Sequence, residues 1–344
     1  MDCSETFSGK KITLMGLGLL GRGVGDAKFL AECGADLVIT DLKKEEELKS
    51  SLKKLQKYKN IKYTLGRHDF KDFEGRDMIL KAANVPLESA YIAHARTRKI
   101  PIEMDESLFA KISNANIVGV TGTRGKTTTT TLVYEILKSA EGDFSGLFGF
   151  KIGKVYLAGN IKGVATLPFL KKVKPNDIFV LELSSWQLQG FDESKISPRV
   201  AIFTNFMDDH LNYYKGDVKR YWMDKAAIFK NQKDGDIFVC SKEVVGIAKS
   251  MEDDKFMLNV TISGPFPKNF KTKLIGQHNL DNISLAIVAA KKIGINVQKI
   301  KKVVSKFSGV PGRLEFIRKW KGISFYNDTT ATTPDAAIAA VRSF

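Results

Sequence analysis

Short apolar runs alternate with glycine-rich turns along the first part of the chain. Strand-like runs occur at residues 11–15 and 35–40, and between them lie a glycine-rich turn and an apolar helix that ends near Glu32. The order strand, turn, helix, strand is typical of a βαβ unit. Further strands are expected at 78–81 and around 100–102. The pattern predicts one small Rossmann-like α/β domain over residues 1–108.

A second α/β pattern begins at residue 116. An apolar strand at 117–120 leads into the turn TGTRGKT and a helix that ends near residue 139. Buried strands are expected at 178–183, 200–204 and 236–240, and a helix at 279–293. Strands that alternate with helices predict a mostly parallel sheet covered on both faces. We expect a central domain of the P-loop ATPase type over residues 109–308.

The last 36 residues read as the start of a third domain, over residues 309–344. A turn at 309–312 precedes a strand at 322–326, and Thr333-Pro334 is a good helix start because an N-cap residue is followed by proline at the first helical position. We expect this part to be an incomplete Rossmann-like domain. Its apolar side chains would then lack partners: Ile323, Phe325, Ala337, Ile338 and Val341.

Composition narrows the class of protein. Hydrophobic residues make up 43% and charged residues 27%, which is an ordinary globular balance. No apolar run approaches the ~20 residues of a membrane-spanning helix, and no signal peptide is recognisable. The net charge of +16 comes from lysines spread over amphipathic helices, so nucleic-acid binding is not expected. Cys3, Cys33 and Cys240 are odd in number and widely spaced, which predicts a reduced cytoplasmic protein without a disulfide framework.

The first glycine-rich turn has the spacing of a dinucleotide fingerprint. Gly16, Gly18 and Gly21 follow a strand and open a helix, and Asp41 ends the next strand. Glycines in this arrangement let backbone amides approach a pyrophosphate. The pattern leaves open NAD or FAD, another nucleotide diphosphate such as a UDP-sugar, and a structural turn.

The second turn is a stronger phosphate-binding signal. In Gly122-Thr123-Arg124-Gly125-Lys126-Thr127, backbone amides would hold phosphates, Lys126 would neutralise them, and the Thr127 hydroxyl would reach Mg²⁺. The common eight-residue spacing needs glycine where Val120 stands, so this is a variant loop.

Candidate metal ligands lie at the ends of two strands. Glu182 ends one strand, where a magnesium ligand or a solvent-facing charge are both plausible. Asp208, Asp209 and His210 follow another, where a metal or proton-transfer role competes with a structural histidine. Lys225 lies in a helix with apolar flanks, and that pattern by itself predicts a snorkelling lysine.

Several motifs together resemble the Mur ligases. They are the phosphate loop at 120–128, LELSSWQL at 181–188, the segment 204–211, GQHNLDN at 276–282 and the segment 312–315. The resemblance runs from about Lys11 to the last residue and favours the D-glutamate-adding branch. It implies a cytoplasmic, monomeric, ATP-dependent amide ligase of peptidoglycan precursor synthesis. The implied substrates are UDP-N-acetylmuramoyl-L-alanine and D-glutamate, which are joined through an acyl phosphate.

The resemblance also implies a role for each matching residue. Catalytic roles fall on Lys126, His210 and Lys225, and the lysine at 225 would be carbamylated. Two Mg²⁺ ions would be held by Thr127, Glu182, His210 and Lys225. ATP would be bound by Gly122, Thr123, Arg124, Gly125, Lys126, Thr127, Thr128, Asn279, Asn282, Arg313 and Asp328. The UDP-linked substrate would contact Gly18, Leu19, Leu20, Asp41, Asn160, Ser184 and His210.

Three departures from the family pattern stand out. Arg124 occupies a position where asparagine is usual, Ala82-Ala83-Asn84 replaces Ser-Pro-Gly, and Thr329-Thr330 replaces Ser-Lys. Since the third domain is expected to be incomplete, we expect UDP-substrate binding, weak ATP binding and no D-glutamate addition. The alternatives are a Mur-type ligase for another amino acid and a non-catalytic UDP-sugar-binding paralogue. An NAD oxidoreductase would leave the second loop unexplained.

Overall fold

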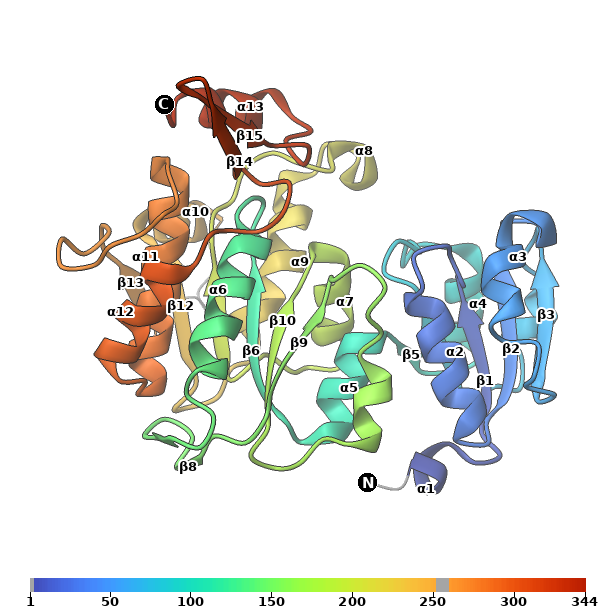
Figure 1. Ribbon diagram of the computed structural model, residues 1–344. Helices are drawn as coiled ribbons and strands as arrows, with labels where there is room; N and C mark the ends of the chain where they lie inside the picture. Colours follow the sequence, from blue (N-terminus) through green and yellow to red (C-terminus); the bar gives the residue numbers. More distant parts are fainter. Residues whose placement is uncertain (1–2, 252–259) are drawn as a thin grey trace. The chain divides into compact units, whose positions relative to one another are not determined.

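The computed structural model describes residues 3–251 and 260–344, which form two compact units (Figure 1). Unit 1 contains the chain up to Ala115 together with Ala158–Pro175 and Ser184–Ile196. Unit 2 contains Asn116–Leu157, Asn176–Leu183 and Ser197–Phe344. The three domains expected from the sequence, with boundaries at 108 and 308, stay a prediction.

Unit 1 is built on a five-stranded sheet in the order β3-β2-β1-β4-β5, in which all neighbours are parallel. The strands predicted at 11–15, 35–40 and 78–81 are confirmed, whereas β3 was missed because its exposed and buried residues alternate weakly. Its elements are α1 (Cys3–Phe7), β1 (Lys11–Met15), α2 (Arg22–Glu32), β2 (Asp36–Asp41), α3 (Glu45–Lys53), β3 (Ile61–Leu65), η1 (Phe70–Phe73), β4 (Met78–Lys81), α4 (Ala90–Thr97), β5 (Ile102–Glu103), α5 (Asp105–Ser113), η2 (Leu167–Lys171) and α7 (Ser185–Glu193).

The expectation that no disulfide is present was wrong. Cys3 of α1 is bonded to Cys33, which follows α2, and their Cα atoms are 5.5 Å apart. The fold supplies the physical reason, since it carries two cysteines that are 30 residues apart in sequence to within bonding distance. Cys240 is a free thiol buried in β12.

Unit 2 is built on a six-stranded sheet in the order β13-β12-β11-β6-β10-β9. Strand β6 pairs in parallel with β10 and β11, and β12 pairs in parallel with β11 and β13. Its elements are β6 (Asn116–Thr121), α6 (Lys126–Lys138), β7 (Phe144–Ser145), β8 (Phe150–Lys151), β9 (Val155–Gly159), β10 (Ile178–Glu182), β11 (Val200–Phe203), α8 (Leu211–Tyr214), α9 (Val218–Lys230), β12 (Ile237–Ser241), α10 (Lys242–Ser250), β13 (Val260–Ser263), α11 (Gln277–Ile293), α12 (Val297–Lys306), β14 (Glu315–Trp320), β15 (Ile323–Asn327) and α13 (Pro334–Val341).

The core of unit 2 lies between the sheet and the helices α6, α11 and α12 (Figure 1). Apolar side chains of these helices pack on Val118, Val120, Ile178 and Val180 of the central strands. Because β10 and all of β6 after Asn116 are buried, the glycine-rich loop that follows β6 starts from a rigid position. The fold therefore confirms the predicted α/β class.

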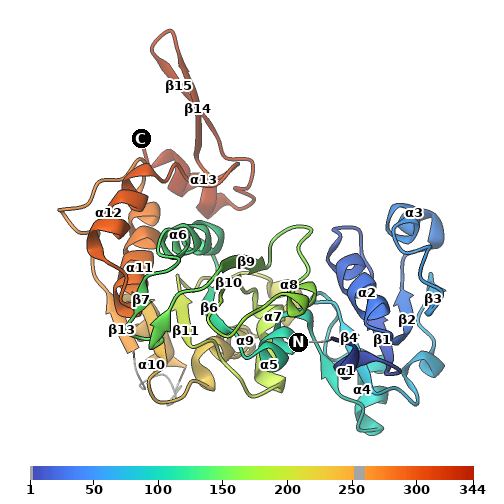
Figure 2. The same cartoon turned by 60° about the horizontal axis from the view of Figure 1, so that its bottom comes forward.

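Residues after Gly312 form a two-stranded hairpin and one helix (Figure 2). Strands β14 and β15 pair antiparallel with each other and with no other strand of the described residues. Ile323, Phe325, Ala337, Ile338 and Val341 are exposed, as expected from the sequence. Thr333 caps α13 through its side chain, as predicted. Among the described residues, no helix is long and apolar enough to span a bilayer.

Candidate functional sites on two glycine-rich loops

The first loop joins β1 to α2 in unit 1 and has backbone angles that favour glycine. Gly16, Gly18 and Gly21 have φ values of 96°, 63° and 90°. Asp41 at the end of β2 accepts a hydrogen bond from the Gly18 amide through Oδ2 at 3.0 Å and one from the Lys43 amide through Oδ1 at 2.9 Å. The structure thus brings Gly18 and Asp41 together, and the carboxylate orders the loop.

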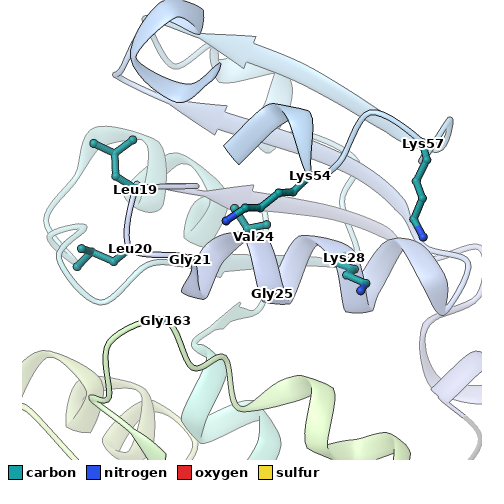
Figure 3. A pocket seen from close by; sticks show the side chains of 9 residues that line it. All are labelled: Leu19, Leu20, Gly21, Val24, Gly25, Lys28, Lys54, Lys57 and Gly163. Atoms are coloured by element: carbon teal, nitrogen blue, oxygen red, sulfur yellow. The ribbon is translucent and has the colours of Figure 1, made fainter. Parts of the chain in front are cut away.

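A pocket of about 600 Å³ lies beside this loop (Figure 3). Leu19 and Leu20, which are 53% and 67% exposed, line one end of it. Lys54, just after α3, reaches toward Val24, and the pocket is also lined by two further lysines and three glycines: Lys28, Lys57, Gly21, Gly25 and Gly163. No carboxylate lines the pocket, so it favours an anionic ligand with an apolar part.

Arg22 connects the first loop to the segment that carries Asn160. Its Nη2 donates to the carbonyl of Gly159 at 3.0 Å, and its Nη1 lies 3.5 Å from Oε1 of Glu106. Asn160 follows directly and is exposed. Arg22 was not identified from the sequence, because a single arginine after a glycine-rich turn carries no signal by itself.

Ser184 belongs to the same network in unit 1. It caps α7, accepts from the Gln187 amide at 3.3 Å and donates to the Gln187 side chain at 2.8 Å. The Gln187 amide group in turn donates to Glu106. Ser184 and Asn160 are therefore linked to one buried carboxylate, Glu106, through Gln187 and Arg22.

Three acids lie close together in the interior of unit 1: Asp26, Asp105 and Glu106. The pKa of Asp105 is raised to about 7. Burial and then the Glu106 charge raise it, against two backbone hydrogen bonds from Thr166 and Leu167. Burial also raises the pKa of Asp26 well above its ordinary value. The sequence carries no local signal for this cluster, because its members come from two helices, α2 and α5, that are far apart in the chain.

The second loop joins β6 to α6 in unit 2. Gly122 has a φ of 144°, and Gly125, the N-cap of α6, has a φ of 77°. A Cβ atom at Gly122 would lie 1.9 Å from Thr204 Oγ1, and one at Gly125 would lie 2.2 Å from Asn282 Oδ1. The predicted residue Asn282 is thus packed against the loop, and Asn279, one turn earlier on α11, is also buried.

The ammonium group of Lys126 lies on this loop. Its Nζ donates to the carbonyls of Gly122 and Thr123, both at 2.9 Å. The pKa of Lys126 is lowered to about 8, mainly by burial. The charges of Arg124 and Arg313 also lower it, whereas those of Glu182 and Asp209 oppose the shift. Four charged groups therefore act on one lysine. Thr127 and Thr128 follow it in the first turn of α6.

Glu182 ends β10 and is 4% exposed, so it is not a solvent-facing strand-end charge. It lies opposite Val120 in the register of β6 and β10, directly before the phosphate loop. Among the described residues, no three His, Cys, Asp or Glu side chains form a ready metal site. Magnesium sites in nucleotide-binding proteins generally combine one or two carboxylates with phosphate oxygens.

Lys225 is buried, and the expectation of a snorkelling lysine was wrong. It is 2% exposed because α9 packs this face on the sheet. Its Nζ donates to the carbonyl of Gly122 at 2.8 Å, the same oxygen that accepts from Lys126. Burial, and then the charge of Lys126, lower the pKa of Lys225 well below its ordinary value.

Asp209 and His210 lie in the segment after β11. The imidazole Nε2 of His210 is 3.8 Å from Oδ2 of Asp209, and burial lowers the pKa of His210. Burial raises the pKa of Asp209, but His210 and Arg124 outweigh this effect and the net shift is downward. Asp208 was predicted beside them and is exposed.

Arg313 and Asp328 lie in the C-terminal segment of unit 2. Asp328 Oδ1 accepts from the Leu314 amide at 3.0 Å, which fixes the turn next to Arg313. Asp328 also acts on the pKa of His278, the neighbour of Asn279, and Arg313 acts on that of Lys126. The structure therefore brings these two predicted residues to the second loop and α11.

Known proteins with similar sequences agree on one family. The model of the Mur ligase middle domain matches residues 120–263. The UDP-N-acetylmuramoylalanine–D-glutamate ligase of Roseiflexus sp. (strain RS-1) is 32% identical, over 98% of this chain and 76% of its own length. The enzyme of the same name from Borreliella afzelii (strain PKo) is 34% identical, over 96% and 73%.

A solved structure agrees on the fold. UDP-N-acetylmuramate-alanine ligase MurC from Thermotoga maritima aligns with a TM-score of 0.57 at 22% identity, over 97% of this chain and 77% of that chain. At this identity the alignment supports the architecture alone. Taken with the sequence relatives, the chain belongs to the Mur ligase family, in the branch of the UDP-N-acetylmuramoylalanine–D-glutamate ligases.

Proposed function

We propose that this chain acts as an ATP-dependent ligase that joins D-glutamate to UDP-N-acetylmuramoyl-L-alanine in peptidoglycan precursor synthesis. The family relationship supports the reaction. The observation that carries it is the cationic loop of unit 2, where four cations, Lys126, Lys225, Arg124 and Arg313, face three carboxylates, Glu182, Asp209 and Asp224. Such an excess of positive charge favours a polyphosphate.

The loop residues would carry out phosphoryl transfer by position and charge. A carboxylate oxygen of the UDP-linked substrate attacks the terminal phosphorus of ATP, and ADP leaves. The amino group of D-glutamate then attacks the acyl carbon, and phosphate leaves. Lys126 and the backbone amides of the loop would bind the phosphate oxygens and offset the charge that accumulates during transfer.

Two Mg²⁺ ions are the metals that this reaction calls for. The donor set fits a hard cation, since the Glu182 carboxylate and Thr127 hydroxyl supply oxygen ligands beside the loop, and His210 lies after the neighbouring strand. When bound, Mg²⁺ would neutralise phosphate charge and polarise the transferring group.

Lys225 would complete the second metal site as a carbamate. Its lowered pKa favours the neutral amine, which is the form that attacks CO₂. Carbamylation would replace a repelled ammonium by an anionic oxygen ligand. Incubation with ¹³C-bicarbonate should give a carbamate carbonyl signal in the NMR spectrum that Lys225→Met lacks. An unlabelled wild-type protein would contradict this role.

In unit 1, the first loop would bind the UDP-linked substrate. Gly18, Leu19, Leu20 and Asp41 lie together there, and the adjoining pocket suits an anion. Asn160 and Ser184 are linked to that loop through Arg22 and Glu106. Apart from His210, which belongs to unit 2, the substrate-binding residues would therefore act as one connected group within unit 1.

Equilibrium binding tests this proposal. UDP-N-acetylmuramoyl-L-alanine should bind more tightly than UDP-N-acetylmuramate and more tightly than the same nucleotide after D-glutamate has been added. ATP should bind as well, and NAD should not compete with the UDP-linked ligand. Preferential binding of UDP-N-acetylmuramate would assign the chain to a different ligation step, and preferential binding of NAD would overturn the proposal.

A further inference from the structure

The backbone of Arg124 is fixed within the phosphate loop. Its amide donates to Asn205 Oδ1 at 2.8 Å, and its carbonyl accepts from Thr204 Oγ1 at 2.5 Å and from Asn205 Nδ2 at 3.2 Å. The segment after β11 therefore holds both polar groups of this peptide. Only the side chain of Arg124 is free to change partners.

The guanidinium group of Arg124 has two outer contacts. Its Nη1 donates to Oδ2 of Asp209 at 2.8 Å, and its Nη2 donates to Thr333 Oγ1 at 3.2 Å. The two arms of the fork thus bind different groups, so the ion pair with Asp209 is not bidentate. The Arg124 side chain is 36% exposed, so a ligand can reach it.

The same guanidinium lies next to the ammonium of Lys126. Both groups contact the carbonyl oxygen of Thr123, Lys126 Nζ at 2.9 Å and Arg124 Nη1 at 3.5 Å. The charge of Arg124 is one of the causes that lower the pKa of Lys126. An anion that binds Lys126 would therefore lie within reach of Arg124 and would relieve the repulsion between the two cations.

We propose that Arg124 is a phosphate-binding residue for ATP and that Asp209 holds its guanidinium in place until the nucleotide enters. This inference rests on the proposed function. A phosphate offers two oxygens to the planar fork, whereas Asp209 uses one arm, so the exchange gains a charge-assisted hydrogen bond. It also releases the Asp209 carboxylate beside His210, and it ends the contact with Thr333 when both arms turn to phosphate.

The replacement of Asp209 by phosphate on Arg124 can be tested without a metal. Titration calorimetry in EDTA measures the affinities for ATP and AMP. Arg124→Gln should weaken ATP binding roughly 10- to 100-fold, which is the range for a charge-assisted hydrogen bond, and leave AMP binding unchanged because AMP lacks the terminal phosphates. Asp209→Asn removes the competing carboxylate and should leave ATP binding equal to or tighter than wild type. Arg124→Lys keeps the charge without the fork and should fall between wild type and Arg124→Gln.

Lys138→Gln is the matched control, since it removes a cation at the other end of the same helix, where Lys138 pairs with Glu141. Equal ATP affinity of Arg124→Gln and wild type would overturn the inference, as would equal losses for ATP and AMP or equal losses in Arg124→Gln and Asp209→Asn. If Arg124→Gln does not fold, Arg124→Lys decides: an unchanged ATP affinity overturns the inference. Failure of wild type to bind ATP would instead overturn the proposed function.

Discussion

The two glycine-rich loops share a plan of strand, tight turn and helix, but their charges differ. In unit 1 the loop itself carries no charge, and Asp41 accepts from its Gly18 amide. In unit 2 the loop carries Arg124 and leads into Lys126, which lies on its carbonyls. Backbone geometry makes both loops capable of approaching a nucleotide, and the side chains decide which part of it each one suits.

Replacing Lys126 by alanine should give the largest effect. Loss of one partner of a buried charge pair costs about 3–5 kcal/mol, so ATP binding should weaken by roughly 100-fold or more. UDP-substrate binding should change little, because the residues proposed for it, apart from His210, belong to unit 1. Titration calorimetry of both ligands checks this, with Lys138→Ala as control. A comparable loss of UDP-substrate affinity would show that the two loops do not act separately.

Asp41→Ala should have the converse effect. It removes the acceptor of two backbone amides, Gly18 and Lys43, and leaves the first loop less ordered. Loss of this acceptor costs about 1–3 kcal/mol, so UDP-substrate binding should weaken roughly 5- to 100-fold while ATP binding is retained. Asp36→Ala, at the other end of the same strand, is the control. Retained UDP-substrate affinity in Asp41→Ala would remove the carboxylate from the first site.

The two units should respond to pH in opposite directions. Asp105 has a pKa of about 7 in the folded chain and an ordinary value of 3.8, so unit 1 loses stability as pH rises between those values. Lys126 has a pKa of about 8 against 10.5, so the folded state binds fewer protons there and unit 2 gains stability from pH 8 to 10.5. Each group changes the free energy of unfolding by at most about 1.4 kcal/mol per pH unit. Hydrogen exchange resolved by segment should show the two slopes, and equal slopes would contradict the assignment.

Asp26→Asn should give the smallest effect and isolate the acidic cluster. Burial, and then Asp105 and Glu106, disfavour the charged form of Asp26, and its Oδ1 has no hydrogen-bond partner. A neutral amide of the same shape should stabilise unit 1 by about 1 kcal/mol at pH 8 and change little at pH 5. Thermal unfolding at both pH values measures this. An equal loss of stability at both pH values would mean that packing, not charge, dominates at residue 26.

Sequence patterns predicted the parts of the fold that are continuous in sequence. The strand at 78–81 and the helix start at Thr333 were placed correctly, because burial of short apolar runs and proline at a first helical position are local signals. Strands β3 and β9 were missed, since they contain exposed or half-buried positions that dilute the apolar pattern. The disulfide between Cys3 and Cys33 depends on tertiary proximity that no spacing reveals.

The features of the candidate site also divide into those that the sequence predicts and those that only the fold reveals. Lys126 and Glu182 were identified because each follows a strand in a recognisable motif, and the fold places both beside the second loop. The hydrogen bonds of Arg22 with Gly159 and of Gln187 with Glu106 were not identified, because each joins residues more than 80 positions apart. The burial of Lys225 likewise follows from how α9 packs and not from its flanking residues.

The close packing around Gly122 and Gly125 restricts how this loop can evolve. A side chain at either position would collide with Thr204 or Asn282, and both backbone conformations strain any other residue. In a saturation library of residues 121–127, selection should therefore leave these two glycines unchanged. Residue 124 has no such backbone constraint. A substitution there would change the affinity for ATP without rebuilding the loop.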